Sequence, residues 1–99
     1  MTTELLALIA AHFACTDIAE QRRFSLDEVQ YCRGVYEDIK LAFVPGVDAQ
    51  DVANLSQDER IAVNKMGFLA FVEWRRRNPM MVRHLEAVAR GEAKLATAG

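Results

Sequence analysis

The stretch Ser56–Pro79 (SQDERIAVNKMGFLAFVEWRRRNP) decides the fold class. Ser56 and Glu59 have the spacing of a capping box, in which each side chain accepts a backbone N–H group at the start of a helix. The apolar run MGFLAFV follows over residues 66–72, and Pro79 is suited to the first position of the next helix, where its missing N–H is not needed. We therefore expect two helices, over residues 57–77 and 79–90.

Upstream of this stretch the sequence predicts two more long helices. Ser25 and Glu28 form a second capping box, and apolar side chains then recur every three or four residues as far as Phe43, the spacing of one helix face. Thr3 is suited to cap an earlier apolar segment, and Asp48 to cap a short turn that follows a Pro-Gly pair. The expected elements are residues 4–15, residues 26–43 and a helical turn near residues 48–54.

No segment shows the strict alternation of apolar and polar residues that is typical of a strand. We expect an all-α fold, a compact bundle of these four main helices plus the short turn. A chain of 99 residues fits one domain, which we place at residues 1–91, with a frayed tail over residues 92–99. The packing order stays open, because short loops allow both an up-down bundle and an orthogonal arrangement.

Two of the expected helices, residues 4–15 and 57–77, carry apolar side chains on nearly every side. Such a helix has to be surrounded, and four helices of this length can surround one central helix but hardly two. We take residues 57–77 as the central helix and expect a second copy, in a two-fold homodimer, to cover residues 4–15. The alternative is a tight monomer with the alanine-rich sides of residues 4–15 near the surface. The expected dimer interface comprises Leu5, Leu8, Ile9 and Phe13.

Charge is nearly balanced over the whole chain and uneven along it. The formal net charge is −2, which removes the strongest electrostatic argument for a nucleic-acid or membrane partner. Residues 1–56 hold nine acidic and four basic side chains, whereas residues 57–99 hold five acidic and eight basic ones. We expect this asymmetry to pair the two halves within one chain; the alternatives are that it orients a partner or attracts an anion.

The best candidate contact site comprises Trp74, Arg75, Arg76, Arg77 and Asn78, which we call the arginine corner. Three arginines at the end of one helix lie beside the start of the next, where free N–H groups and the helix dipole favour anions. A guanidinium binds a carboxylate or a phosphate through two parallel hydrogen bonds. The structural alternative is that these arginines complement the helix dipole and pair with acidic residues of the first half.

Enzymatic and metal-binding patterns are absent from the sequence. It has no nucleophile-elbow, zinc-protease or phosphate-loop spacing, so we expect no enzyme and no cofactor. Cys15 and Cys32 lack Cys-x-x-Cys spacing, and we expect two reduced core thiols. Together with His12 and His84 they are zinc-ligand types, but they do not form the tight pairs of structural zinc sites, so no metal is expected.

The first apolar segment is neither a signal peptide nor a membrane span by its pattern. Residues 5–15 are shorter than the roughly 20 residues that cross a bilayer, and no basic residue precedes them. We expect a cytoplasmic protein without a membrane partner.

The leading functional hypothesis is a small non-enzymatic helical protein, an adaptor or regulator, that acts through protein–protein interaction. It would be homodimeric and would contact an acidic partner through the arginine corner. The alternative is a nucleic-acid-associated regulator that uses the same corner together with Arg22, Arg23 and Arg83.

Overall fold

Side chains cap the helix starts in the computed structural model of the chain, which describes residues 1–95. The side chains of Ser25, Asp48 and Ser56 each accept a hydrogen bond from the backbone N–H three residues on, and the carboxylate of that residue accepts one from the backbone N–H of the cap. These are three complete capping boxes, each of which satisfies two N–H groups that the helix leaves free. The first helix is capped by Thr2, through the N–H of Leu5, and not by Thr3 as expected.

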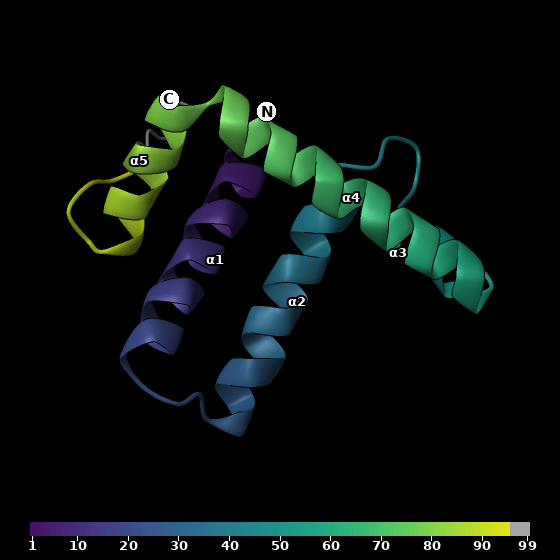
Figure 1. Ribbon diagram of the computed structural model, residues 1–99, viewed down its shortest axis with the longest axis horizontal. Helices are drawn as coiled ribbons and strands as arrows, with labels where there is room; N and C mark the ends of the chain where they lie inside the picture. The colour runs from purple at the N-terminus through teal and green to yellow at the C-terminus, as the bar shows by residue number, and fades with distance from the viewer. Residues whose placement is uncertain (96–99) are drawn as a thin grey trace.

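The helices form an antiparallel hairpin crossed by a long helix (Figure 1). α1 (Thr3–Gln21) and α2 (Leu26–Ala42) make the hairpin, because a connection of only four residues joins them. α3 (Ala49–Ala53) is the short turn, α4 (Gln57–Arg77) crosses the end of the hairpin, and α5 (Pro79–Ala89) lies beside α1. The described residues contain no strand. The predicted all-α fold with four main helices and one short turn is therefore confirmed.

α1 continues six residues beyond its expected end at residue 15. Thr16 lies inside this helix, where its hydroxyl donates to the carbonyl oxygen of His12 at 3.2 Å. α1 and α2 pack against each other as the two arms of the hairpin, and the added turns continue the first arm (Figure 1). Contacts between helices outweigh a local propensity that is worth a fraction of a kcal/mol per residue.

The core is built around α1. Ile9 has no exposed surface and Phe13 keeps 6 %, and both pack with Ile39 of α2, Phe71 of α4 and Leu85 of α5. Three other helices of the same chain thus cover this face of α1. The prediction that Ile9 and Phe13 lie in a dimer interface is wrong, because side chains with almost no exposed surface cannot contact a second chain.

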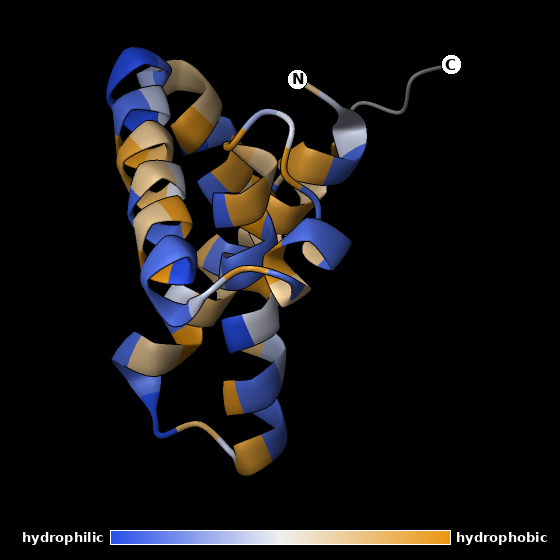
Figure 2. Cartoon of the chain, turned by 90° about the vertical axis from the view of Figure 1, so that its right-hand side faces the viewer, coloured by the Kyte–Doolittle hydropathy of each residue, from blue (hydrophilic) through white to orange (hydrophobic). Residues whose placement is uncertain are grey.

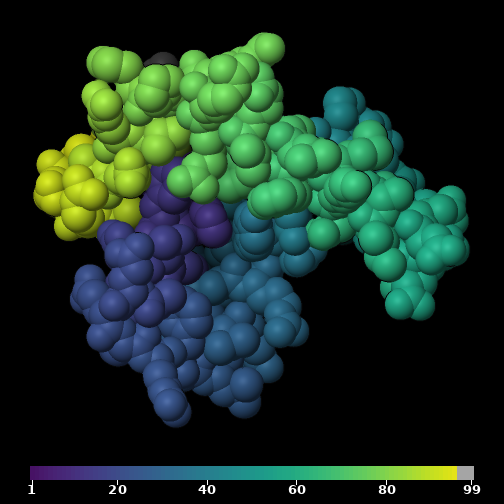
Figure 3. Space-filling view, viewed as in Figure 1, coloured from purple at the N-terminus to yellow at the C-terminus, as the bar shows by residue number. Residues whose placement is uncertain are grey.

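α4, and not α1, is the apolar helix that its own chain leaves partly uncovered. Leu5 and Leu8, the other two expected interface residues, are half-buried and pack against the same core. The assignment of residues 57–77 as the central helix is wrong for a geometric reason. α4 crosses only the end of the hairpin and runs on past α2, so one side of it faces the core and the opposite side faces solvent (Figure 3).

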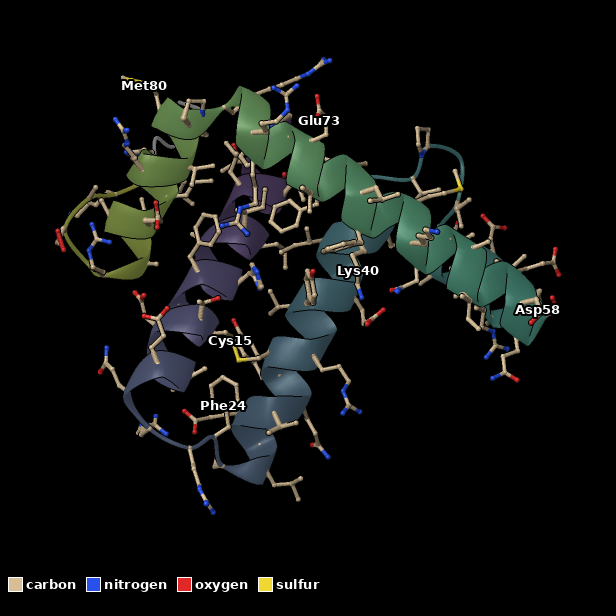
Figure 4. All side chains as sticks on the ribbon, viewed as in Figure 1. Cys15, Phe24, Lys40, Asp58, Glu73 and Met80 are labelled. Carbon is tan, nitrogen blue, oxygen red and sulfur yellow. A yellow bond between two sulfur atoms is a disulfide. The ribbon has the colours of Figure 1, made fainter. Side chains whose placement is uncertain are left out.

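The backbones of α4 and α2 are in direct contact at Gly67. A Cβ placed on Gly67 would lie 2.1 Å from the carbonyl oxygen of Lys40, far inside van der Waals contact. Beneath this crossing the Lys40 side chain is buried (Figure 4). Its ammonium donates to the Glu37 carboxylate at 3.0 Å and lies 4.5 Å from the centroid of the Tyr36 ring. The absence of a side chain at residue 67 thus sets how closely α4 lies on the hairpin.

A disulfide joins Cys15 of α1 to Cys32 of α2, whose Cα atoms lie 6.0 Å apart (Figure 4). The prediction of two reduced core thiols is wrong, because the spacing along the chain does not show that the hairpin brings these two positions side by side. The bond closes a loop with a sequence separation of 17. It ties the two arms of the hairpin together covalently.

The chain turns after α5 at Gly91, which has a φ of +76° that favours glycine. Leu95 then packs against the core cluster. The remainder of the expected frayed tail, residues 96–99, lies outside the described residues.

Candidate interaction site

The arginine corner lies where α4 ends and α5 begins, and Trp74 anchors it to the core. The Trp74 ring is half-buried and packs with two other aromatic rings, at centroid distances of 6.2 Å from Phe43 and 6.4 Å from Phe71. Aromatic packing of this kind stabilises by about 1 kcal/mol per pair beyond the area that it buries. The last turn of α4 therefore holds a fixed position, from which its arginines project.

Arg75 lies over aromatic rings of the core. Its guanidinium carbon lies 5.1 Å from the centroid of Phe13 and 5.6 Å from that of Phe71. Both distances are within the range of a cation–π interaction, which contributes about 1 kcal/mol at a partly exposed position. Arg75 is thus a packing residue as well as a charge, and its removal would disturb the core.

Arg76 and Arg77 share one carboxylate, that of Glu73. The Glu73 oxygens accept from Arg76 at 2.6 and 2.9 Å and from Arg77 at 2.7 Å. The hydrogen bond from Arg76, with the smaller contribution of Arg77, lowers the pKa of Glu73 from 4.5 to about 2. Both arginine side chains remain about 70 % exposed and so keep N–H groups directed to solvent.

The ion pairs of the described residues are local. Each of them joins side chains at most six residues apart, and none links the acidic first half of the chain to the basic second half. The expected pairing between the halves is therefore not made by direct ion pairs, and Asp17 of the first half acts on Arg90 of the second only through space. Helix geometry explains three of these pairs, since residues three or four apart face each other on one helix, and the core between the helices consists mainly of apolar side chains.

Asn78 directly precedes α5, but its side chain does not cap that helix. Its side-chain amide instead donates to the carbonyl oxygen of Trp74 at 2.8 Å, and no side chain caps the start of α5. Asn78 thus stabilises the end of α4 and fixes the turn between the two helices.

The structure does not bring Arg22 and Arg23 to the arginine corner. Both lie in the connection at the far end of the hairpin (Figure 1). Arg22 is held there by the carboxylate of Glu28, at 2.6 and 2.8 Å. Arg83 is exposed on α5. Arg22 and Arg23 therefore do not extend the arginine corner into a wider basic surface.

His12 belongs to the aromatic packing of the hairpin. Its ring stacks on Tyr36 with a centroid distance of 4.7 Å and an interplanar angle of 8°. Burial, and then the positive charge of Arg75, lower the pKa of His12 below its ordinary value of 6.5. The sulfurs of Cys15 and Cys32 are bonded to each other. Within the described part of the chain, no three metal-ligating side chains gather in one place.

The outer side of α4 is exposed, although the sequence predicts a central helix. The run MGFLAFV is apolar on all sides, but only Gly67 and Phe71 of it are buried. Figure 2 shows hydrophobic colours along the middle of α4 between hydrophilic ends. The exposed side chains on its outward side, which we call the outer stripe, are Ile61 (59 % exposed), Phe68 (42 %), Leu69 (53 %) and Val72 (44 %).

A pocket of about 540 Å³ adjoins the outer stripe at Ile61. It lies between the end of α2, α3 and the first half of α4. Leu41, Val52 and Val63 give it an apolar floor, and charged side chains of α2 and α4 stand around it. Exposed apolar surface thus extends from α4 onto the neighbouring helices.

No helix among the described residues combines the length and the apolar character that a membrane crossing requires.

Comparisons with protein-family models, with curated proteins and with solved structures found no match for this chain.

Proposed function

We propose that this chain is a non-enzymatic interaction protein, an adaptor or regulator, that works as a homodimer and contacts an acidic protein partner through the arginine corner. The observation that carries the proposal is the surface around α4. A row of large apolar side chains is exposed along that helix and ends in three arginines balanced by a single carboxylate. Monomeric proteins rarely expose apolar patches larger than a few hundred Å² unless the patch is a contact surface.

The arginine corner has the charge and the geometry to bind carboxylates. Arg76 and Arg77 both bond to Glu73 and retain further N–H donors. Trp74 and Asn78 fix the turn from which they project. A rigid, net-positive corner beside apolar surface suits an acidic peptide segment or an acidic helix with apolar residues.

The protein hypothesis is favoured over the nucleic-acid hypothesis by the position of the other basic residues. Duplex binding uses several phosphate contacts along a continuous basic face. Here Arg22 and Arg23 lie at the opposite end of the hairpin from the corner.

The proposal is tested by binding of a fluorescent poly-glutamate peptide and of a duplex DNA oligonucleotide, measured from about 50 to about 200 mM salt. The variant Arg76→Ala/Arg77→Ala removes two corner charges without touching the packing residue Arg75. The matched control, Arg23→Ala/Arg33→Ala, removes the same charge from two exposed positions away from the corner, one in the connection between α1 and α2 and one on α2.

We expect the corner variant to lower the affinity for poly-glutamate about tenfold, since each exposed ion pair contributes up to about 0.7 kcal/mol. The control should bind the peptide nearly as well as the natural chain. Equal affinity of the two variants for poly-glutamate would overturn the proposal that the arginine corner is the binding site. A different result is that DNA binds more tightly than poly-glutamate, with a salt dependence of the affinity that is weaker in the corner variant. That result would favour the nucleic-acid function over the protein partner.

The cytoplasmic location proposed from the sequence depends on the redox state of the two cysteines. Disulfides persist in oxidising compartments and are rare in cytosolic proteins, so the bond between Cys15 and Cys32 counts against that location. Alkylation of the chain in rapidly quenched cells tests it. Two labelled thiols would support the cytoplasm, and no labelled thiol would exclude it.

A further inference from the structure

The outer stripe of α4 has the spacing of a helix–helix contact. Ile61, Phe68, Leu69 and Val72 stand at positions i, i+7, i+8 and i+11, which fall on one side of a helix. Figure 3 shows α4 across the front of the molecule with no other element over it. The stripe is therefore open along most of the length of α4.

The exposed surface of the chain is larger than a monomer of its mass requires. It measures 7081 Å² for 11.1 kDa, whereas the surface of a folded monomer of that mass is about 5,700 Å², which leaves an excess of about 1,400 Å². A stable protein–protein interface takes about 800 Å² from each partner. This excess is summed over the whole chain and reflects an open shape, in which the outer stripe is part of the exposed apolar surface.

The charges at the two ends of the stripe are opposite in sign. Asp58 lies near the start of α4 and Arg76 near its end (Figure 4 marks Asp58, and Glu73 beside the opposite end). Eighteen residues separate the two positions in the sequence, which is five full turns at 3.6 residues per turn. Asp58 and Arg76 therefore lie on the same side of α4 as the stripe.

This charge pattern complements itself when two copies of α4 lie antiparallel. Asp58 of each copy then lies opposite Arg76 of the other, which is also bonded to Glu73 of its own chain, and the stripes meet between these two pairs. The helix dipoles also oppose each other in this arrangement. Lys65 lies between the apolar side chains of the stripe, where its aliphatic stem can follow apolar surface while the ammonium stays in water.

We propose that the outer stripe is the interface with a second copy of this chain, packed antiparallel along α4 about a two-fold axis near the middle of that helix. This inference rests on the proposed homodimer and assigns its contact to α4 in place of α1. A two-fold contact requires a surface that is complementary to itself, and an acidic end, an apolar centre and a basic end meet that requirement.

The first experiment measures mass in solution by sedimentation equilibrium, from about 1 to about 100 μM, the range in which a specific interface of ordinary size is populated. The natural chain should show twice 11.1 kDa. Leu69→Lys should raise the dissociation constant about 100-fold or more, because the change enters one interface twice and places a charge in its apolar centre. The matched control is Leu26→Lys, at a residue that is 73 % exposed at the far end of the hairpin, and it should dimerise as the natural chain does.

The second experiment tests the antiparallel arrangement by charge reversal. Asp58→Lys alone and Arg76→Glu alone should each weaken self-association about tenfold, since each places two like-charged pairs in the dimer. An equimolar mixture of the two variants should form a heterodimer as tight as the natural dimer, because both pairs then have opposite signs.

Each outcome has a separate consequence. A mass of 11.1 kDa up to 100 μM would overturn both the homodimer and the assignment of the outer stripe as its interface. The outer stripe would then be a contact surface for a different protein. A dimer that survives Leu69→Lys would overturn only the assignment to α4. Loss of the dimer in Leu69→Lys, without recovery in the mixed charge variants, would overturn the antiparallel arrangement. Binding of poly-glutamate is measured in Leu69→Lys as well, because this variant keeps all three arginines of the corner and so separates the failure of the dimer from the failure of the corner.

Discussion

Gly67→Ala tests whether the crossing of α4 over α2 is as close as the structure shows. The new Cβ would lie 2.1 Å from the carbonyl oxygen of Lys40, 2.7 Å from its carbonyl carbon and 3.0 Å from its Cα. Carbon atoms in favourable contact lie at least about 3.5 Å apart. The clash is with backbone, which cannot rotate aside, so the two helices must separate by about 1 Å or more.

The expected magnitude follows from two opposing effects. Overpacking of a well-packed contact costs up to about 3 kcal/mol, whereas alanine in place of glycine inside a helix gains about 1 kcal/mol. The net loss is about 2 kcal/mol. With a urea slope of about 1 kcal/mol per M for a chain of this size, the unfolding midpoint should fall by about 2 M.

Gly34→Ala provides the matched control, since it makes the same change inside α2. A Cβ at Gly34 would meet no atom within 4 Å. Only the gain in helix propensity remains, and the urea midpoint should rise by about 1 M. Circular dichroism during urea titration measures both variants. Equal stabilisation by the two substitutions would refute the close crossing, because the clash would then be absent at residue 67 as well.

Three further predictions concern the disulfide and two titrating groups. Reduction of the disulfide between α1 and α2 should lower the free energy of unfolding by about 3 kcal/mol, the chain-entropy value for a loop of this length; urea titration with and without dithiothreitol measures it, and an unchanged midpoint would contradict the bond. The pKa of Glu73 is lowered from 4.5 to about 2, so its ion pairs stabilise the fold above pH 4.5, and this contribution is lost as pH falls from 4.5 towards 2. Carboxyl NMR should show the low titration midpoint, and Arg76→Ala should raise it; a midpoint that stays near 2 in the variant would contradict the assigned cause. The pKa of His12 is lowered below 6.5 by burial and then by Arg75, so stability should be full above pH 6.5 and fall as pH drops through the range between 6.5 and the folded pKa. Ring-proton NMR should show that Arg75→Ala raises the pKa of His12 while burial still keeps it below 6.5, and no change would mean that the guanidinium does not act on the ring.

The candidate site was predictable as far as it depends on neighbours in the sequence. Trp74, the three arginines and Asn78 were singled out from their order alone, and they do form one corner at a helix junction. Their partners were not predictable. Arg75 lies over the ring of Phe13, which belongs to another helix, and the shared carboxylate of Glu73 was passed over in favour of acidic residues in the first half of the chain.

The amino-acid sequence by itself determined the helices and most of their starting points. Capping boxes and the three-to-four spacing of apolar residues act within one or two turns, so they can be read without knowledge of the fold. The tertiary structure alone decided which apolar helix is covered, which cysteines meet and where two backbones touch. These outcomes depend on the angles at which helices are joined, and no pattern within a single helix contains that information. Two helices with similarly apolar sequences therefore have different environments, α1 packed among three helices of its own chain and α4 with one side open to solvent.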